Sequence, residues 1–287
     1  MARKPKKRRW KRRLGVFALL VLTLAAYAVW ENTTPERTYF DVSFSGLPHG
    51  FDDCRIVVLS DLHGAEFGEG NSALLAAVAA EEPEYIFYLG DLEDRFRGHT
   101  EGYAETIGAG LSAIAPTYYV TGNHEWAVGE VPALKKTLAA AGVTVLSNQY
   151  VTLTRNGDAI VLAGIDDPNG YADQKTPEQL ASELYAAEGD PFWLLLAHRN
   201  DRFAAQYSLL GADLVLSGHG HGGIWRPPFT DGLVSHDFQL FPSYMAGLYE
   251  ENGSALFVTR GLGNSGPSFR LMNRPEVAVL TLHTKAG

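Results

Sequence analysis

The chain has 287 residues, of which 46% are hydrophobic and 20% are charged. This composition excludes a disordered or collagen-like chain and is typical of one large globular domain or two small ones. Its single cysteine, Cys54, excludes an intramolecular disulfide and a structural zinc site built from Cys-x-x-Cys pairs. Nine of the 24 Lys and Arg residues lie within 1–13, which holds no acidic residue, so the rest of the chain carries a net charge of −18. Such an acidic body argues against a nucleic-acid partner, because affinity for a phosphate backbone comes from clustered basic residues.

An uncharged apolar run, 14–30, follows the basic segment. A helix of that length covers roughly 25 Å, close to the lower limit for crossing the apolar core of a bilayer. We therefore predict a cytoplasmic basic segment and a single-pass anchor in the cytoplasmic membrane, with the following residues outside the cytoplasm. The alternative is a signal peptide, because Ala26-Tyr27-Ala28 fits the small-x-small cleavage pattern and cleavage near Ala28 would release an exported protein.

The remainder of the chain predicts an α/β domain. Residues 31–50 are expected to form a linker that leads into an edge strand, 38–44, and residues 51–287 the domain itself. The further predicted strands are 55–59, 85–89, 117–120, 143–146, 151–154, 159–163, 192–196, 214–216, 255–258 and 277–282, and the predicted helices are 72–81, 101–114, 133–141, 177–187 and 202–210. Strands that alternate with helices of this length indicate an α/β fold. The pair Asn156-Gly157 predicts an antiparallel hairpin, so the sheets are expected to be mixed.

Clusters of metal-ligand residues follow five of these strands, at the ends where open α/β sheets place their sites. They are Asp61 and His63; Asp91 and Asp94; Asn123, His124 and Glu125; His198; and His219 and His221. Each cluster alone is weak evidence for a metal site, because a lone Asp after a strand is usually a cap or turn residue and a lone His is usually a surface or core group. Together, carboxylate, imidazole and amide groups suit Mn, Fe or Zn. These ten residues offer too many ligands for one such ion. Seven ligands would be the right number for two ions that share a carboxylate, an arrangement suited to phosphate-ester hydrolysis.

The ordered motifs resemble the calcineurin-like metallophosphoesterase superfamily over about residues 54–282. They are Asp61-x-His63, Gly90-Asp91-x-x-Asp94, Gly122-Asn123-His124-Glu125, His198 and Gly218-His219-x-His221. The GHGHGG form, the later GLY and RGLG segments and the N-terminal apolar run resemble its membrane-associated bacterial branch of YkuE-type phosphoesterases. The resemblance implies a four-layer α/β/β/α sandwich of two mixed β-sheets that holds two divalent metal ions.

The resemblance also implies a role for each motif residue. It assigns Asp61, His63 and His221 to the first ion, Asn123, His198 and His219 to the second, and Asp91 to a bridge between them. His124 would stabilise the phosphate and protonate the leaving alkoxide, assisted by Asp94, and Asn123 would also contact substrate. Where many relatives have Thr, this chain has Gly220, which we expect to change loop stiffness without loss of metal. We expect Arg95 to reach the substrate phosphate and Arg199 to be an ordinary loop charge.

The predicted function is a metal-dependent phosphoesterase that cleaves phosphomonoesters or phosphodiesters with a metal-activated water. We expect a monomer whose substrate is linked to a lipid or to the cell envelope. One alternative is a lipid enzyme similar to UDP-2,3-diacylglucosamine pyrophosphatases, which act on the cytoplasmic side, and another is a non-catalytic metal-binding envelope protein. Residues 261–266 (GLGNSG) match a dinucleotide-binding pattern, but Pro267 follows and no helical pattern does, so we predict a turn near the site.

Overall fold

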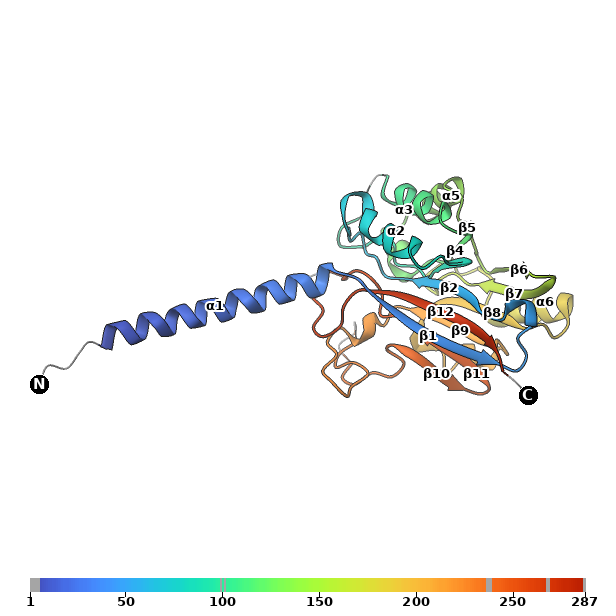
Figure 1. Ribbon diagram of the computed structural model, residues 1–287. Coiled ribbons are helices and arrows are strands. Elements are labelled where there is room, and N and C mark those ends of the chain that lie inside the picture. Colours follow the sequence, from blue (N-terminus) through green and yellow to red (C-terminus); the bar gives the residue numbers. More distant parts are fainter. Residues whose placement is uncertain (1–5, 99, 101, 236–238, 267–268, 286–287) are drawn as a thin grey trace, which may run out of the picture.

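A computed structural model describes residues 6–98, 100, 102–235, 239–266 and 269–285. Helix α1 (Lys6–Thr33) extends away from a domain built of two six-stranded sheets with helices outside them (Figure 1). The four-layer arrangement predicted from the sequence is confirmed.

The first sheet has the strand order β1-β12-β2-β3-β4-β5. Its strands are β1 (Glu36–Phe44), β12 (Glu276–Thr284), β2 (Cys54–Leu59), β3 (Tyr85–Tyr88), β4 (Thr117–Tyr119) and β5 (Thr144–Val145). All neighbours are parallel except β12 and β2. Helices α2 (Ser72–Ala79), α3 (Tyr103–Ser112) and α5 (Val131–Ala140) pack on its outer face through apolar side chains.

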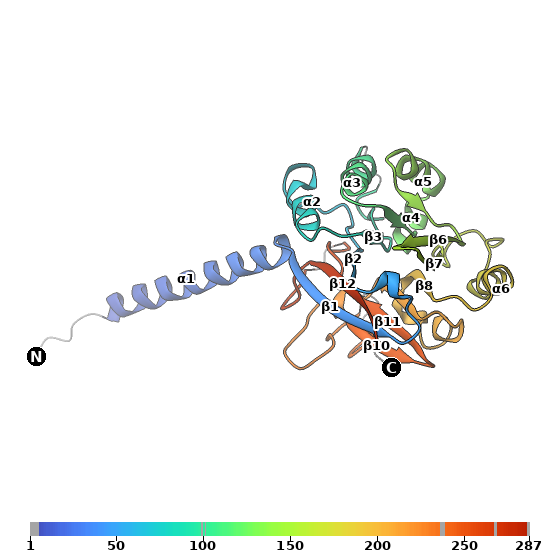
Figure 2. The same cartoon turned by 45° about the vertical axis from the view of Figure 1, so that its right-hand side comes forward.

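The second sheet has the order β10-β11-β9-β8-β7-β6. Its strands are β10 (Gly247–Glu251), β11 (Ser254–Val258), β9 (Leu214–Gly218), β8 (Trp193–Arg199), β7 (Asp158–Gly164) and β6 (Gln149–Arg155). The predicted hairpin joins β6 and β7 in antiparallel pairing, and β10 and β11 are also antiparallel. Helix α6 (Pro177–Glu188) lies on the outer side of this sheet and is seen at the right of the turned view (Figure 2).

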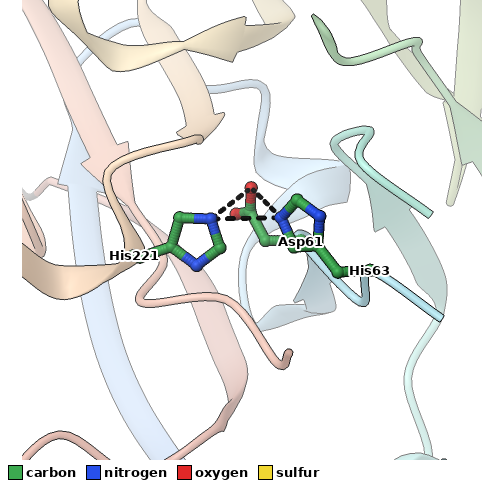
Figure 3. Close-up of side chains that lie close together, drawn as sticks. All are labelled: Asp61, His63 and His221. Carbon is green, nitrogen blue, oxygen red and sulfur yellow. Dashed lines mark hydrogen bonds and ion pairs between the residues drawn. The ribbon is translucent and has the colours of Figure 1, made fainter. Parts of the chain in front are cut away.

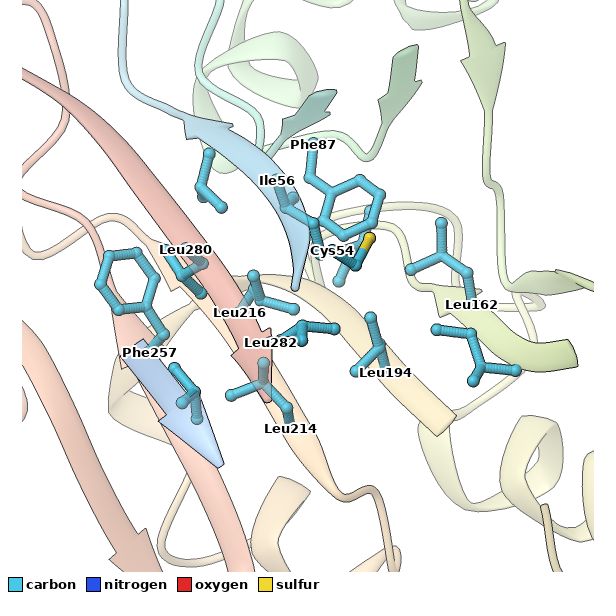
Figure 4. Close-up of a cluster of buried hydrophobic side chains, with 14 of the residues drawn as sticks. Cys54, Ile56, Phe87, Leu162, Leu194, Leu214, Leu216, Phe257, Leu280 and Leu282 are labelled. Atoms are coloured by element: carbon cyan, nitrogen blue, oxygen red, sulfur yellow. The ribbon is translucent and has the colours of Figure 1, made fainter. Parts of the chain in front are cut away.

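A shared apolar core lies between the two sheets. Its members include Cys54, Ile56, Phe87, Leu162, Leu194, Leu214, Leu216, Phe257, Leu280 and Leu282 (Figure 4). The parallel strands are covered on both faces, which is why they are continuous apolar runs in the sequence. Each fully buried side chain of this kind contributes about 1.5–3 kcal/mol relative to an exposed one. The core holds the strand ends, and therefore the site residues, in fixed positions.

The structure differs from the prediction in three elements. Residues 202–210 are not an α-helix: they form two short 3-10 turns, η3 (Asn200–Arg202) and η4 (Tyr207–Leu209). Phe203 and Tyr207 are buried and four residues apart, which imitates the apolar face of a helix. Helix α4 (Asn123–Val128) and the edge strand β10 were not predicted. The alternating exposure of β10 includes two Glu residues, which gives a weak strand signal.

Helix α1 ends against the domain and not in a linker. Residues 31–33 complete the helix, and β1 begins at Glu36. The Glu31 carboxylate is buried and accepts a hydrogen bond from the backbone N–H of Asn273 (3.0 Å). The Asn32 side chain accepts from the N–H of Arg270 (2.7 Å) and donates to its carbonyl (3.0 Å). The last turn of α1 is thus fixed to the domain.

Candidate metal centre

The seven residues predicted as metal ligands lie together at the carboxyl ends of strands from both sheets. Asp61 and His63 follow β2, Asp91 follows β3, Asn123 begins α4 after β4, His198 lies near the end of β8, and His219 and His221 follow β9. All except Asn123, which is half-buried, are at most 7% exposed. The convergence of five strand ends is what brings residues 61 and 221 into one site.

Five of these seven residues have left-handed backbone conformations. They are Asp61, His63, Asp91, His219 and His221, with φ between 47° and 65°. This conformation costs a residue other than glycine about 1–2 kcal/mol, and such costs cluster at functional sites. The fold therefore holds these side chains in orientations that the backbone alone does not favour.

One group of converging atoms consists of Asp61, His63 and His221 (Figure 3). The Nε2 atoms of His63 and His221 lie 3.1 Å apart. Oδ1 of Asp61 is 3.9 Å from Nε2 of His63 and 3.7 Å from Nε2 of His221. The three side chains come from two strand ends and point at one common position.

A second group consists of Asp91, His198 and His219. Nε2 of His198 lies 3.1 Å from Nδ1 of His219 and 3.2 Å from Oδ1 of Asn123. Oδ2 of Asp91 lies 3.3 Å from Nε2 of His198 and 3.5 Å from Nε2 of His63. One carboxylate oxygen therefore stands between the two histidine groups.

Glycines provide the space for these carboxylates. A Cβ at Gly122 would lie 2.2 Å from Oδ1 of Asp91, and a Cβ at Gly218 would lie 2.7 Å from Oδ2 of Asp61. Gly261 has φ +68° and lies equally close to Asp61, because its Cβ would be 2.8 Å from Oδ2. The GLGNSG segment is thus a turn against the site, as predicted.

Glu125 fixes the loop that carries Asp91, a role that was not predicted although the residue stands in the GNHE motif. Its carboxylate accepts four backbone N–H hydrogen bonds, from Asp91 (3.0 Å), Leu92 (2.6 Å), Glu93 (3.1 Å) and Gly122 (2.7 Å). Burial and the Asp91 charge raise the pKa of Glu125 to about 8, and these N–H groups oppose that rise. Glu125 therefore joins the loops after β3 and β4.

The electrostatics of the ion-free site couple Asp91 and His198. Burial disfavours charge on both, but the Asp91 carboxylate raises the pKa of His198 to about 10. The same contact holds the pKa of Asp91 well below its usual range despite burial. Burial lowers the pKa of His63 to about 3, so its imidazole is neutral. The pair Asp91 and His198 is an ion pair in this state.

The donor atoms fit two divalent ions. Each group contains two imidazole nitrogens 3.1 Å apart, and Oδ2 of Asp91 lies within 3.5 Å of a histidine nitrogen of each group. Imidazole nitrogen with carboxylate and amide oxygen is a typical donor set for Zn, Fe or Mn. The glycine-lined space around Asp61 and Asp91 keeps these oxygens free of backbone obstruction.

His124 lies beside the metal-ligand groups and is held from several sides. Its backbone N–H donates to Oδ1 of Asp91 (2.8 Å). Its Nδ1 lies 3.1 Å from Oδ1 of Asp94, and the backbone N–H of Arg95 donates to the same Nδ1 (3.1 Å). When Nδ1 is protonated the ring donates to Asp94, and Nε2, which is 3.4 Å from Oγ of Ser265, faces the cavity.

A cavity of about 530 Å³ opens over the site. Its wall includes His124, His219 and His221 and three arginines, Arg95, Arg199 and Arg270. The fully buried Arg270 donates from Nη2 to the carbonyl of Gly263 (2.8 Å), and the same atom lies 3.3 Å from Nδ1 of His221. No sequence motif marked Arg270. Three guanidinium groups make this cavity suitable for an anion.

Arg199 lines the cavity, whereas we expected it to be an ordinary solvent-exposed charge on a loop. Its Nε donates to Oδ2 of the buried Asp167 (2.8 Å), and its Nη1 lies 3.5 Å from Nε2 of His219. The absence of a side chain at Gly220 also has a structural reason, because a Cβ there would lie 2.8 Å from Nδ2 of Asn200. Asn200 uses that atom to donate to the carbonyl of Tyr244 (2.7 Å).

Comparisons with known proteins identify the family of the chain. The calcineurin-like phosphoesterase family matches residues 54–223, which include all seven converging residues. The uncharacterized metallophosphoesterase YkuE of Bacillus subtilis is 29% identical over 253 residues, covering 86% of this chain and 85% of its own. A Danio rerio transmembrane protein with a metallophosphoesterase domain is 29% identical over 285 residues, 94% of this chain and 63% of that protein. A solved dimetal phosphatase from Danio rerio has a TM-score of 0.47 and 13% identity, covering 80% of this chain and 98% of that one. The chain belongs to the calcineurin-like phosphoesterase family and is a phosphoester hydrolase.

Proposed function

We propose that the chain hydrolyses phosphomonoesters or phosphodiesters with two metal ions at the outer face of the cytoplasmic membrane. The observation that supports this most is the position of Asp91, whose Oδ2 lies 3.5 Å from Nε2 of His63 and 3.3 Å from Nε2 of His198. A carboxylate shared between two nitrogen-rich groups is the arrangement that two adjacent ions require.

Each group would hold one ion, with Asp91 shared. The ligands of the first would be Asp61, His63 and His221, and those of the second Asn123, His198 and His219. Bound Mn, Fe or Zn supplies a nucleophilic water at neutral pH and neutralises charge on the phosphoryl oxygens.

The chain's own residues would bind the ester and move the proton. Arg95, Arg199 and Arg270 face the cavity and would bind the phosphoryl oxygens, joined by the Asn123 amide. As the water oxygen bonds to phosphorus and the water gives up one proton to solvent, the bond from phosphorus to the leaving alkoxide breaks. His124, in its doubly protonated form, would give the Nε2 proton to that alkoxide.

Asp94 would act as a positioning residue for His124. Its Oδ1 also accepts from the N–H of Phe96 (3.0 Å), and its Oδ2 accepts from the N–H of Gly266 (3.2 Å). Held on both oxygens, the carboxylate keeps the imidazole ring in one orientation.

The membrane placement is supported by α1. The most apolar 18-residue window of its segment Trp10–Thr33 has a mean hydropathy of 1.9, and only 6% of that window is buried. The basic residues of 1–13 favour a cytoplasmic N-terminus, which would leave the domain outside. The anchor would then keep the enzyme beside lipid-linked or envelope-linked phosphate esters. A fusion reporter at the C-terminus tests this directly, because a cytoplasmic signal would refute the outer-face location and favour the pyrophosphatase-like alternative.

Activity is tested with the full chain in detergent micelles, stripped of metal and then given Mn, Fe, Zn or Mg. The substrates are bis-p-nitrophenyl phosphate and p-nitrophenyl phosphate, and the variants are Asp91→Ala and, as a control, the exposed Asp190→Ala. We expect metal-dependent turnover that the first variant abolishes and the second retains. Equal turnover by Asp91→Ala and the unaltered chain would refute the proposal.

A further inference from the structure

We infer that the face of the domain around the end of α1 is a membrane-docking surface, which inserts apolar side chains into the bilayer that holds the helix. The inference rests on the proposed membrane span. It assigns the substrate class as a phosphoester carried by a lipid of that bilayer, since the site cavity adjoins this face.

The end of α1 is in direct contact with the domain, with no flexible linker between them. Glu31 and Asn32, at the end of α1, hydrogen-bond to Asn273 and Arg270. The guanidinium of Arg274 lies 4.5 Å from the ring centroid of Trp30. Because these contacts begin where the apolar segment ends, whatever flanks residues 270–274 lies at the level of the membrane interface.

Seven large apolar side chains on this face form what we call the docking surface. They are Trp225, Phe229, Leu240, Phe241, Phe269, Leu271 and Met272, each at least 36% exposed, and Phe229 completely so. Isolated exposed side chains of this type are ordinary, whereas a contiguous set marks an interaction site.

Backbone contacts bring together the segments that carry the docking surface. The backbone N–H of Leu271 donates to the carbonyl of Ile224 (3.3 Å), which pairs the segments of Leu271 and Trp225. The ring centroids of Trp225 and Phe269 lie 5.7 Å apart. The N–H of Leu233 donates to the carbonyl of Trp225 (2.7 Å), and the N–H of Phe241 donates to Leu233 (3.0 Å). The loops that carry these residues lie on the side of the domain from which α1 extends (Figure 1).

A bilayer suits this surface better than a protein partner does. The docking surface lies close to the end of α1, because Arg270, which stands between Phe269 and Leu271 in the sequence, hydrogen-bonds to Asn32. Trp and Phe side chains favour the membrane interface, where an apolar face enters the region between head groups and acyl chains.

The same segments form the wall of the catalytic cavity, which links the docking surface to the substrate. Ile224, adjacent to Trp225, and Arg270, adjacent to Phe269, both line the cavity. Phe96, which is 61% exposed, lines it next to the site residue His124, at a ring distance of 6.3 Å. A cavity that opens here receives a phosphoester at the depth of lipid head groups.

Depth-dependent quenching tests the docking surface in the full chain. The chain is reconstituted in vesicles of phosphatidylcholine and phosphatidylglycerol, and a thiol-reactive fluorophore is placed at Leu240→Cys, Leu20→Cys or Leu209→Cys. Leu20 reports on the span, and Leu209 is the matched control, with 67% exposure against 64% for Leu240. Leu209 comes before the first residue of β9, whereas His219 of the metal centre follows the last residue, so Leu209 lies at the end of the strand away from the site. The native Cys54 is fully buried, and burial raises its pKa to about 12, so it stays unlabelled.

Acyl-chain nitroxide lipids should quench the labels at Leu20→Cys and Leu240→Cys but not at Leu209→Cys. Quenching at Leu20→Cys alone would overturn the docking surface and leave the anchor intact. Quenching at none would overturn both the anchor and the docking surface.

A kinetic comparison tests the substrate class. The double variant Leu240→Ser/Phe241→Ser should lower turnover of a vesicle-embedded p-nitrophenyl ester of phosphatidic acid by about tenfold, the effect of about 1.4 kcal/mol of lost interfacial binding. Its turnover of soluble bis-p-nitrophenyl phosphate should not change, and Leu209→Ser should change neither. An equal loss on both substrates, or no loss on the lipid ester, would overturn the inference. Failure of the unaltered chain on the soluble ester would refute the proposed function instead.

Discussion

The Nε2 atoms of His63 and His221 lie 3.1 Å apart, although the two residues are separated by 158 positions in the chain. Both backbones are left-handed at these residues, with φ of 48° and 47°. Two buried imidazole nitrogens at this distance can share only one proton in a hydrogen bond with each other. Together with the nearby Asp61 and Asp91 oxygens, the two nitrogens form a set of donor atoms suited to bind a cation.

Replacement of His124 should affect esters according to their leaving groups. His124→Gln cannot donate a proton as an acid, so hydrolysis of an alkyl phosphate should fall by about 10²–10⁴-fold. Turnover of p-nitrophenyl phosphate should fall much less, since p-nitrophenolate leaves without protonation. Steady-state rates on glycerol phosphate and p-nitrophenyl phosphate measure this split. Equal losses on both substrates would contradict the role of His124 as the acid.

Asp94→Asn should show the same leaving-group dependence with a smaller amplitude, because the amide still contacts Nδ1 of His124 but no longer favours the charged ring. The exposed Asp173→Asn provides a control and should leave both rates unchanged. The ratio of alkyl phosphate turnover to p-nitrophenyl phosphate turnover should therefore fall in Asp94→Asn. Equal losses on both substrates would argue for a purely structural Asp94.

Gly261→Ala should weaken metal binding. Its Cβ would lie 2.8 Å from Oδ2 of Asp61, so this carboxylate would move. The matched control is Gly253→Ala, which has a similar positive φ (82° against 68°) but open space around the new methyl group. Both should lose about 1–2 kcal/mol in free energy of unfolding from the left-handed backbone. Only Gly261→Ala should lose roughly 10–100-fold in metal affinity, measured by calorimetric titration. Equal affinities would contradict the close approach.

Glu125→Gln should destabilise the site loops. The carboxylate accepts four backbone N–H groups, and an amide NH₂ would face two of them with no acceptor. We expect a loss of about 3 kcal/mol in the free energy of unfolding, measured by denaturant titration of the metal-free chain at about pH 9, where Glu125, with its pKa of about 8, is ionised. Glu183→Gln, at an exposed pair with Lys175, should cost less than about 1 kcal/mol. A similar small loss for both variants would show that Glu125 does not hold the loops.

Metal loading should release a proton. The Asp91 carboxylate overcomes burial and raises the pKa of His198 to about 10, so the ring is charged at pH 8 in the ion-free chain. A metal ligand must be neutral imidazole, and ion affinity should therefore rise with pH up to about 10, by as much as tenfold per pH unit. Calorimetric titration at pH 8 in two buffers of different ionisation enthalpy counts the proton. Affinity that is independent of pH between 7 and 9 would contradict this protonation state.

The fold and the site motifs were predictable where sequence signals are strong. The runs before Asp61, Asp91 and His219 are apolar because parallel strands are buried on both faces, and the ligand residues follow directly. Each ligand cluster stands at a strand end, so the order of the motifs was enough to bring them into one site.

Contacts made by loops were not predictable. Arg270 and Asp167 reach the site from segments with no motif, and their roles depend on the packing of residues far away in the sequence. The attachment of α1 through Asn32 was missed for the same reason, since nothing in the local sequence distinguishes a linker from a docked helix end. The helix predicted over 202–210 failed because the spacing of Phe203 and Tyr207 is equally compatible with turns.

The most direct test of the central claim is the electron paramagnetic resonance spectrum of the full chain loaded with Mn²⁺. If Asp91 joins two ions, the spectrum will be that of an exchange-coupled manganese pair, with two ions per chain, and Asp91→Ala will lose the coupling along with its hydrolysis of bis-p-nitrophenyl phosphate. A spectrum of isolated Mn²⁺ in the unaltered, active chain would contradict the shared-carboxylate centre.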